Sequence, residues 1–479
     1  MEKKIPYSVL TEYPPYNVSE VHSLFEKACS NMHPKLVVLD DDPTGIQTVH
    51  DVSVYTTWDE AAVRQGFEEP GDLFFILTNS RSFSAKKTRE VHQEIAYNIC
   101  SASKQTGKPF IIFSRSDSTL RGYFPLETET LKTTVEKETG IHYDGEILAP
   151  FFLEGGRYTI DDVHYVKQGN ELCPAGQTEF AQDKSFSYTA SNLKEWVEEK
   201  SGHTISAASV VGIELTDLRS MNIDKIEQQL LSVKDFGKVI VNAVDYTDLE
   251  IFGIAFFRAV AKGKQFMFRC AASIVKVLGN VSTIPLLMHD DLIDKTNHKG
   301  GIVLIGSHVR KTTMQMEELK KISSLEFIEF NQHLVLEDLG LEKEVVRTIG
   351  LAEKYIESGK SVVVYTRRDR LDLPENDPEK NLAVSVTISD AVTSIIAKLK
   401  VRPSFIVAKG GITSSDVGTK ALKVKKARVM GQLQPGVPVW MTGPESKFPS
   451  MPYVIFPGNV GEIDTLRKVV EELNWRDEI

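Results

Sequence analysis

The sequence predicts an α/β protein of two domains, each a largely parallel sheet flanked by helices. Short apolar runs rich in β-branched residues alternate with helical patterns along most of the chain, which is typical of parallel sheets. At 479 residues the chain is longer than one hydrophobic core usually spans. Several apolar runs end in charged or glycine-containing turns, where α/β proteins place their sites.

The composition is that of a globular protein with an acidic surface. Apolar residues make up 41% of the chain and charged residues 25%, and the net charge is −10. This charge disfavours nucleic acid as a partner, because such a partner is usually bound by a basic face. No stretch approaches about 20 consecutive apolar residues, and the N-terminus lacks the apolar core of a signal peptide. We therefore expect a cytoplasmic protein with no membrane partner.

The first predicted strand, residues 35–39, ends at three successive carboxylates. Asp40, Asp41 and Asp42 come directly after the apolar run and before a Pro-x-Gly turn. Residues 1–33 are predicted to form an N-terminal arm, and the first domain is predicted over residues 34–285. Like charges held together at the end of a buried strand shift one another's pKa, which is typical of a functional site.

Two further apolar runs in the first domain also end in polar clusters. The run at 73–77 meets Thr78-Asn79-Ser80-Arg81, and the run at 110–113 meets Ser114-Arg115-Ser116-Asp117-Ser118-Thr119-Leu120-Arg121-Gly122. Another strand is predicted at 52–56 and a helix at 84–103. Because the carboxyl ends of parallel strands meet at one edge of a sheet, we expect the polar clusters to lie together.

The rest of the first domain carries weaker signals. Residues 154–159 form a predicted loop with two glycines and an arginine, followed by strands near 210–213 and 239–243. A long helix is predicted over 248–277. The polar segment 279–300 has glycines at both ends and is the predicted domain boundary.

The second domain, residues 300–479, contains three glycine turns that each follow a predicted strand. They are Gly306-Ser307-His308, Gly410-Gly411-Ile412-Thr413 and Pro457-Gly458-Asn459. Glycine lets backbone N–H groups approach an anion closely, so such turns favour a phosphate site. Neither a Walker A motif nor Gly-x-Gly-x-x-Gly is present.

Further strands are predicted in the second domain at 325–330, 361–366, 404–408 and 453–456, and helices at 341–358, 386–400, 415–425 and 459–473.

Taken together and in this order, the motifs resemble those of the four-carbon acid sugar kinases. The resemblance rests on Asp41-Asp42-Pro43-Thr44-Gly45, the turn ending at Arg81, the cluster from Ser116 to Gly122 and Gly410-Gly411-x-Thr413. It implies that the first domain binds a small, tetronate-like sugar acid and that the second binds ATP with Mg²⁺. The implied activity is transfer of a phosphoryl group from ATP to a hydroxyl of the acid, at an active site in the cleft between the two domains.

The resemblance also implies roles for individual residues. Asp41 and Asp42 would be catalytic, and the choice between them as the base stays open. Arginine forks suit carboxylate recognition, and a carboxylate can accept the proton of the reacting hydroxyl. The implied substrate-binding residues are Asn79, Arg81, Asp117, Ser118 and Arg121. The implied ATP-binding residues are Ser307, Gly410, Gly411, Ile412, Thr413 and Gly458. No metal ligand is assigned, and a homodimer is left open.

Three positions depart from the family pattern. His308 stands where a small residue is expected, Ile412 where an acidic residue is expected, and Pro457 where the family tends to have serine. These departures place the chain in a divergent branch of the family.

Two other functions fit parts of the sequence. Asp40-x-Asp42-x-Thr44 after a strand, with Thr78-Asn79 and His289-Asp290-Asp291 later, is also similar to haloacid dehalogenase-type phosphatases, in which Asp40 would be a nucleophile and Mg²⁺ the cofactor. The departures in the glycine turns allow a non-catalytic sugar-acid sensor. His164, His289 and His308 are interpreted as hydrogen-bonding groups rather than metal ligands, and Arg367–Arg370 as a surface turn.

Overall fold

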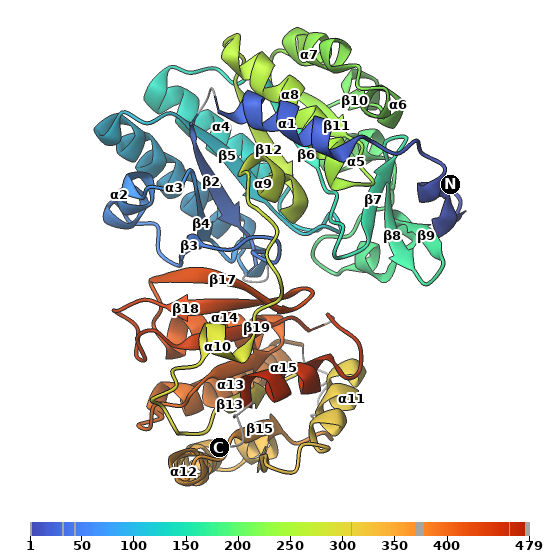
Figure 1. Cartoon of the computed structure of the whole chain (residues 1–479). Helices are drawn as coiled ribbons and strands as arrows, with labels where there is room; N and C mark the ends of the chain where they lie inside the picture. Colours follow the sequence, from blue (N-terminus) through green and yellow to red (C-terminus); the bar gives the residue numbers. More distant parts are fainter. Residues whose placement is uncertain are drawn as a thin grey trace. The chain divides into compact units, whose positions relative to one another are not determined.

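The computed structural model describes residues 2–30, 33–42, 45–307, 309–369, 371, 378–458 and 460–474. The motif residues Pro43, Thr44, His308 and Asn459 lie outside this part of the chain, as does Arg370 of the predicted surface turn. The chain divides into two compact units (Figure 1). Unit 1 comprises Met1–Thr48 and Thr57–Thr283, and unit 2 comprises Val49–Thr56 and Ile284–Ile479.

The main sheet of unit 1 is parallel throughout. Its strands are nearly continuous apolar runs, which is typical of a sheet that is covered by helices on both faces. In spatial order they are β10 (Val211–Ile213), β11 (Gly237–Val241), β6 (Gly145–Ala149), β12 (Phe266–Cys270), β5 (Phe110–Arg115), β2 (Lys35–Asp40) and β4 (Leu73–Leu77).

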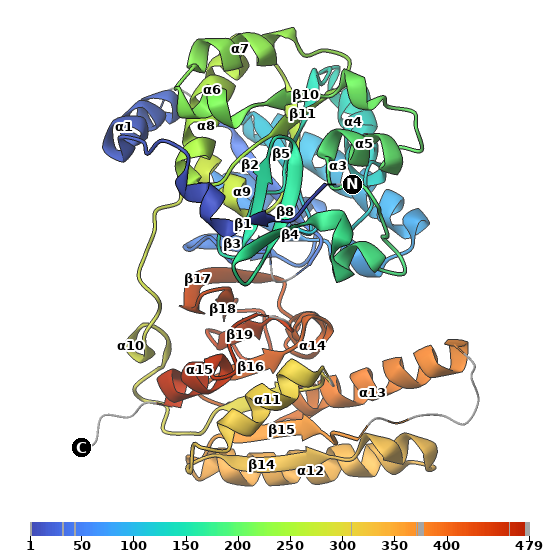
Figure 2. The ribbon, with the colours of Figure 1, turned by 90° about the vertical axis from the view of Figure 1, so that its right-hand side faces the viewer.

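Helices cover both faces of this sheet. Figure 2 shows α3 (Ala85–Thr106) and α4 (Leu126–Thr139) on one side, and α1 (Val18–Cys29), α8 (Tyr246–Ala261) and α9 (Ala272–Leu278) on the other. The helix α1 packs on α8, where Gly253 leaves room for the Phe25 ring. The remaining helices of unit 1 are α2 (Glu60–Glu68), α5 (Leu193–Lys200), α6 (Leu215–Arg219), α7 (Ile223–Ser232), η1 (Tyr7–Thr11), η2 (Ser80–Ser82), η3 (Ala175–Gln177), η4 (Glu179–Gln182) and η5 (Ala207–Ser209).

The long helix predicted over 248–277 is wrong. The segment forms α8, then the strand β12, then α9. Gly263 adopts φ 97° just after α8 ends, and β12 pairs with both β5 and β6. Phe268 of β12 stacks on Phe113 of β5 with ring centroids 4.3 Å apart. A buried strand and a buried helix have the same apolar composition, so the hydrophobic pattern alone does not separate them.

A small antiparallel sheet lies beside the main sheet of unit 1 and was not predicted. Its order is β1 (Ile5–Pro6), β9 (Glu171–Pro174), β8 (Val163–Gln168) and β7 (Arg157–Ile160). The first residues of the chain are therefore paired through β1 with β9, more than 160 positions later.

The sheet of unit 2 is mixed. Its order is β3 (Val52–Tyr55), β17 (Lys426–Gln434), β18 (Val437–Thr442), β19 (Pro452–Phe456), β16 (Ile406–Lys409), β13 (Ile302–Ile305), β15 (Val362–Thr366) and β14 (Glu326–Phe330). The pairs from β3 to β19 are antiparallel, and those from β19 to β14 are parallel. The strands predicted at 325–330, 361–366, 404–408 and 453–456 are therefore all in the parallel part.

The helices of unit 2 are α10 (His289–Leu292), α11 (Arg310–Leu319), α12 (Gly340–Glu357), α13 (Pro378–Lys398), α14 (Gly411–Asp416), the π-helix η7 (Val417–Ala421), η6 (Gln332–Leu336) and α15 (Thr465–Asn474). The core contains Val303, Val407 and Val454 from adjacent strands, against Leu466 and Val469 of α15. The predicted helix at 415–425 ends early, because the helical turns of α14 and η7 stop at Ala421 and Lys423 then adopts φ 55°. None of the helices in the described chain has an apolar stretch that could cross a membrane.

Candidate active site

Three parallel strands of unit 1 end at the same level. Asp40, the last residue of β2, lies opposite Leu77 of β4 and Arg115 of β5. Consequently, the turns that follow these strands start together at one edge of the sheet. The structure thereby brings together the predicted residues of three turns. We call them the unit 1 cluster: Asp41, Asp42, Arg81, Asp117 and Arg121.

Arg81 is the centre of this cluster. Its Nη2 lies 3.1 Å from Asp41 Oδ1 and 3.0 Å from Asp42 Oδ2, and its Nη1 lies 3.7 Å from Asp117 Oδ1. It comes from η2, where the preceding Asn79 adopts a left-handed conformation with φ 54°. The Arg81 guanidinium thus joins carboxylates from two different strand ends, and these carboxylates raise its pKa although burial opposes the shift.

Asp40 faces the interior rather than the cluster's open side. Its side chain is 1% exposed, and its Oδ1 is 3.0 Å from Arg115 Nη1 and accepts a hydrogen bond from the backbone N–H of Asp42. Among the described residues, its Oδ2 has no hydrogen-bond partner. Burial raises the pKa of Asp40 to about 7, although Arg115 opposes the shift. Asp40 therefore serves to hold the strand end in place.

Asp41 and Asp42 differ in accessibility. Asp41 is 3% exposed, and both its oxygens are engaged, Oδ1 by Arg81 and Oδ2 by the Ser116 hydroxyl at 2.7 Å. Burial raises the pKa of Asp41. Asp42 keeps 25% of its side chain exposed while contacting Arg81. Of the two, Asp42 is the carboxylate that a ligand can reach.

Asp117 is held by arginines on two sides. Arg121 Nε lies 2.6 Å from its Oδ2, Arg81 lies on the other side, and the Thr119 hydroxyl donates to the same Oδ2. Burial acts to raise the pKa of Asp117, but Arg81 and Arg121 outweigh it and hold the pKa well below its ordinary value. Asp117 therefore stays ionised and is suited to positioning rather than to accepting protons.

The loop from Ser116 to Gly122 is fixed by residues that are distant in sequence. His164 Nε2 donates to the Ser118 carbonyl at 2.7 Å, and the Tyr188 hydroxyl donates to the Thr119 carbonyl at 2.7 Å. Gly122 adopts φ 118°, and a Cβ there would lie 2.8 Å from Arg269 Nη2 and from Ser116 Oγ. Ser118, a predicted substrate-binding residue, is buried, and its carbonyl is occupied by His164.

His164 is a hydrogen-bonding group, as interpreted from the sequence. Because a carbonyl oxygen can only accept, Nε2 carries the proton and Nδ1 accepts from the Thr159 hydroxyl at 3.0 Å. Burial lowers the pKa of His164 to about 4, so the ring is neutral at pH 7.

A buried hydrogen-bonding network beneath the cluster was not predicted from the sequence. Arg269 of β12 forms an ion pair with Glu127 of α4, whose other oxygen accepts from Ser80 Oγ at 2.6 Å. Arg269 also donates to Ser114 Oγ at 3.2 Å. Charged residues at the ends of apolar runs, such as Arg115 and Arg269, are the signal that could have identified these supports.

In unit 2 the three glycine turns also start at one level. Ile305 of β13 is opposite Lys409 of β16, and Lys409 is opposite Phe456 of β19. Gly410 N–H donates to the Phe456 carbonyl at 2.9 Å. A Cβ on Gly306 would lie 2.8 Å from Thr413 Oγ1, and one on Gly410 would lie 3.6 Å from Ser307 Cβ. The structure thus brings together Ser307, Gly410 and Thr413.

Two basic residues support these turns. Lys409 is fully buried, and its Nζ donates to the carbonyls of Pro457 and Gly458 at 2.8 and 3.0 Å. Burial lowers the pKa of Lys409 to about 7. Arg368, interpreted from the sequence as part of a surface turn, donates to the Ser307 carbonyl at 2.8 Å and to Thr313 Oγ1 at 2.6 Å. Ile412 projects outward and is 75% exposed.

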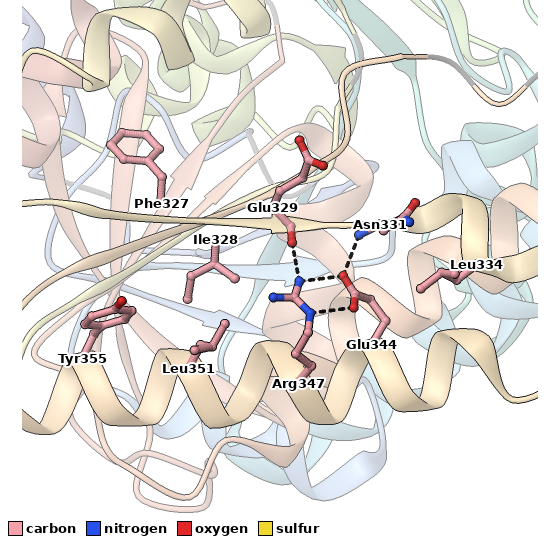
Figure 3. Close-up of a pocket in the computed structure, with 9 residues that line it drawn as sticks. All are labelled: Phe327, Ile328, Glu329, Asn331, Leu334, Glu344, Arg347, Leu351 and Tyr355. Atoms are coloured by element: carbon pink, nitrogen blue, oxygen red, sulfur yellow. Dashed lines mark hydrogen bonds and ion pairs between the residues drawn. The ribbon is translucent and has the colours of Figure 1, made fainter.

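Two pockets of the structure contain none of the residues predicted for the kinase site, and His289 and Asp290 of the phosphatase alternative line one of them. Figure 3 shows one of about 400 Å³ between β14 and α12 of unit 2, lined by Phe327, Tyr355 and neighbouring side chains. Its polar groups satisfy one another, since Arg347 donates to both oxygens of Glu344 and to the Glu329 carbonyl. The other lies near α10 and α15 and has a volume of about 480 Å³.

Within the described ranges, no group of three or more histidine, cysteine, aspartate or glutamate side chains is arranged to hold a metal ion. The carboxylates of the cluster are directed at arginines instead.

Two family models match the chain. The sugar-binding N-terminal domain matches residues 36–278, and the nucleotide-binding C-terminal domain matches residues 302–466. None of the curated proteins matches the sequence.

Two solved structures are similar along almost their whole length. Protein HI1011 of Haemophilus influenzae superposes with a TM-score of 0.60 and 16% identity, over 91% of this chain and all of its own. A protein described as the putative tRNA synthase from Salmonella typhimurium LT2 superposes with a TM-score of 0.63 and 15% identity, over 90% of this chain and 98% of its own. At these identities the similarity establishes a shared fold.

Proposed function

Because the chain belongs to the four-carbon acid sugar kinase family, in which a sugar-binding N-terminal domain precedes a nucleotide-binding C-terminal domain, we propose that it is an ATP-dependent kinase. Its substrate is a small, tetronate-like sugar acid, and the reaction transfers the terminal phosphoryl group of ATP to a hydroxyl of that acid. We assign the acid to residues 34–285 and the nucleotide to residues 300–479.

The observation that carries the proposal is the cluster around Arg81. One accessible carboxylate, Asp42, lies beside a guanidinium that also holds Asp41 and Asp117. This arrangement suits a group that orients a hydroxyl and accepts its proton, because the arginine fixes the position of a carboxylate that keeps a quarter of its side chain exposed. Asp41 and Asp117 then act as buried supports that orient Arg81.

The proposed reaction is a single displacement. The substrate hydroxyl oxygen attacks the terminal phosphorus, the bond from that phosphorus to ADP breaks, and the hydroxyl proton passes to Asp42. The backbone N–H groups of Ser307 and Gly411 are suited to the phosphates of ATP. The N–H of Gly410 is already engaged by the Phe456 carbonyl, so Gly410 contributes to the shape of the turn. Lys409 supports the turns by fixing the Pro457-Gly458 carbonyls.

Mg²⁺ belongs to the proposal as a companion of ATP. Since the described residues offer no cation cage, we assign the ion to the nucleotide's phosphates, where it would offset their charge. The oligomeric state stays a prediction.

No specific observation favours the alternatives. The phosphatase interpretation needs Asp40 as an exposed nucleophile, but Asp40 is 1% exposed and paired with Arg115.

The test is ADP release by the full chain with ATP and Mg²⁺, measured with D-erythronate, L-threonate, D-gluconate and the uncharged polyol erythritol. We expect at least one acid to raise ADP release well above the background, with a phosphorylated acid detected by phosphorus NMR. If no acid does so, or if the protein instead releases phosphate from sugar phosphates without ATP, the kinase proposal is wrong.

A further inference from the structure

Arg157 occupies a fixed position beside the unit 1 cluster. It is the first residue of β7, and its backbone exchanges two hydrogen bonds with Phe152, at 2.9 and 3.1 Å. Between them, Gly156 adopts φ 69° and donates to the Leu153 carbonyl at 2.9 Å. The hydrogen-bonded turn therefore fixes the backbone of Arg157, and with it the position of the Arg157 Cα and Cβ atoms.

Arg157 has no carboxylate partner in the described chain, unlike the other arginines of this region. Arg81 contacts three carboxylates, and Arg121 lies 2.6 Å from Asp117 and 3.5 Å from Asp183. Arg157 Nη1 donates to the Gly155 carbonyl, whereas its Nε is buried without an acceptor. A buried donor without an acceptor costs about 1–3 kcal/mol, so a ligand that supplies one is favoured.

The Arg157 guanidinium lies close to the predicted substrate residues. It lies 5.6 Å from the centroid of the Phe180 ring, and the Arg121 guanidinium lies 5.2 Å from the same centroid. Burial lowers the pKa of Arg157, and the nearby Asp117 opposes the shift. Two guanidinium groups therefore meet at one aromatic ring, and only Arg121 is paired with acidic side chains.

We propose that Arg157 binds the carboxylate of the substrate and so determines the preference for an acid over the corresponding neutral polyol. A planar guanidinium can hold a carboxylate through two parallel hydrogen bonds, and Nε of Arg157 has no acceptor among the described residues. This inference rests on the proposed sugar-acid function. It adds a carboxylate-binding residue to Arg81 and Arg121, whose charges are already engaged by acidic side chains.

The experiment measures binding and turnover separately. The proteins compared are the full chain and its variants Arg157→Gln and Arg157→Lys. Calorimetry gives the Kd of each protein for D-erythronate, L-threonate, D-gluconate and erythritol. ADP release gives the kcat and KM of each protein. We expect Arg157→Gln to weaken the tightest-bound acid roughly 10- to 100-fold, as for the loss of a charge-assisted pair. Erythritol binding should change less than about threefold, and Arg157→Lys should bind the acid with intermediate affinity.

Arg64→Gln is the matched control, because Arg64 is an exposed arginine of α2 whose partner is Glu68. It should bind all ligands as the wild type does. The inference is wrong if Arg157→Gln binds the acid normally, or loses acid and polyol equally. If the wild type binds an acid but releases no ADP, the kinase proposal fails, and the acid binding of Arg157→Gln alone decides the Arg157 assignment. If no acid binds the wild type, both are overturned.

Discussion

At the scale of single residues, partners and burial separate the buried, paired carboxylates of the unit 1 cluster from the one that is accessible. Asp40 and Asp41 have the same side chain as Asp42, yet they are 1% and 3% exposed and tied to Arg115 and Arg81. Only Asp42 combines an arginine contact with an exposure of 25%. The sequence leaves open whether Asp41 or Asp42 is the catalytic base. The difference in exposure favours Asp42, and this preference can be tested.

Replacing Asp42 should remove catalysis without unfolding the protein. We expect Asp42→Asn to lower kcat about 100-fold or more, because the hydroxyl loses its proton acceptor. The Kd of ATP and the urea midpoint should stay close to those of the wild type. By contrast, Asp41→Asn should lower stability by about 1–3 kcal/mol, since it disturbs a buried pair with Arg81 and Ser116. A near-normal kcat for Asp42→Asn would show that another group is the base.

His164 should make stability depend on pH. Its pKa falls from 6.5 to about 4 on folding, so between these values the unfolded chain binds the proton more readily than the native state. The stabilisation is complete above pH 6.5 and is lost as the pH falls towards 4, by about 3 kcal/mol. Urea unfolding of the wild type and of His164→Gln at several pH values measures this difference. Equal losses in both proteins would contradict it.

At the scale of elements, the turns after parallel strands carry the candidate sites, and distant segments lock those turns. β8 provides His164 for the Ser116–Gly122 loop, and β7 begins with Arg157. In unit 2, Lys409 at the end of β16 holds the turn after β19. The strand ends thus place the polar groups, while neighbouring elements set their orientation.

Gly122 should be indispensable for the shape of its loop. Gly122→Ala combines φ 118° with a Cβ 2.8 Å from Arg269 Nη2 and Ser116 Oγ. We expect a loss of about 3 kcal/mol or more of stability, together with a weaker affinity for the acid. Gly107→Ala is the matched control, because Gly107 has φ 69° but open space around its Cβ position. Its cost should be only about 1 kcal/mol. Similar costs for both variants would refute the role given to Gly122.

At the scale of the whole molecule, each unit has its own sheet edge with its own chemistry. Unit 1 presents carboxylates and arginines, and unit 2 presents glycine turns backed by Lys409 and Arg368. The matches to a sugar-binding and a nucleotide-binding family model follow the same division. Each ligand should therefore act mainly on one unit.

Hydrogen exchange measured by mass spectrometry tests this division. We expect ATP with Mg²⁺ to slow exchange in peptides that contain Ser307, Gly410–Thr413 and Gly458. The acid should slow exchange in peptides that contain Arg81, Ser116–Gly122 and Arg157. The peptide over α12 is the internal control and should not respond to either ligand. Protection of the unit 1 cluster by ATP alone would contradict the assignment of ligands to units.

Much of the site could be predicted from the sequence, because its signals are local. An apolar run followed by Asp40-Asp41-Asp42, or by Gly410-Gly411, is visible in a short window of residues, and parallel strands then bring such ends to one edge. The strand β12 and the antiparallel sheet of β7, β8 and β9 were missed, because buried strands and short irregular segments lack a distinctive period.

The sequence by itself determined the α/β class, the strand ends and the residue types gathered there. Only the tertiary structure decided which aspartate is accessible, which arginines are already paired and which strand Val52–Tyr55 joins. The physical reason is that burial and ion pairing depend on residues far apart in the chain. His164 and Ser118 are 46 positions apart, Arg269 and Glu127 are 142 apart, and β3 pairs with β17 near the end of the chain.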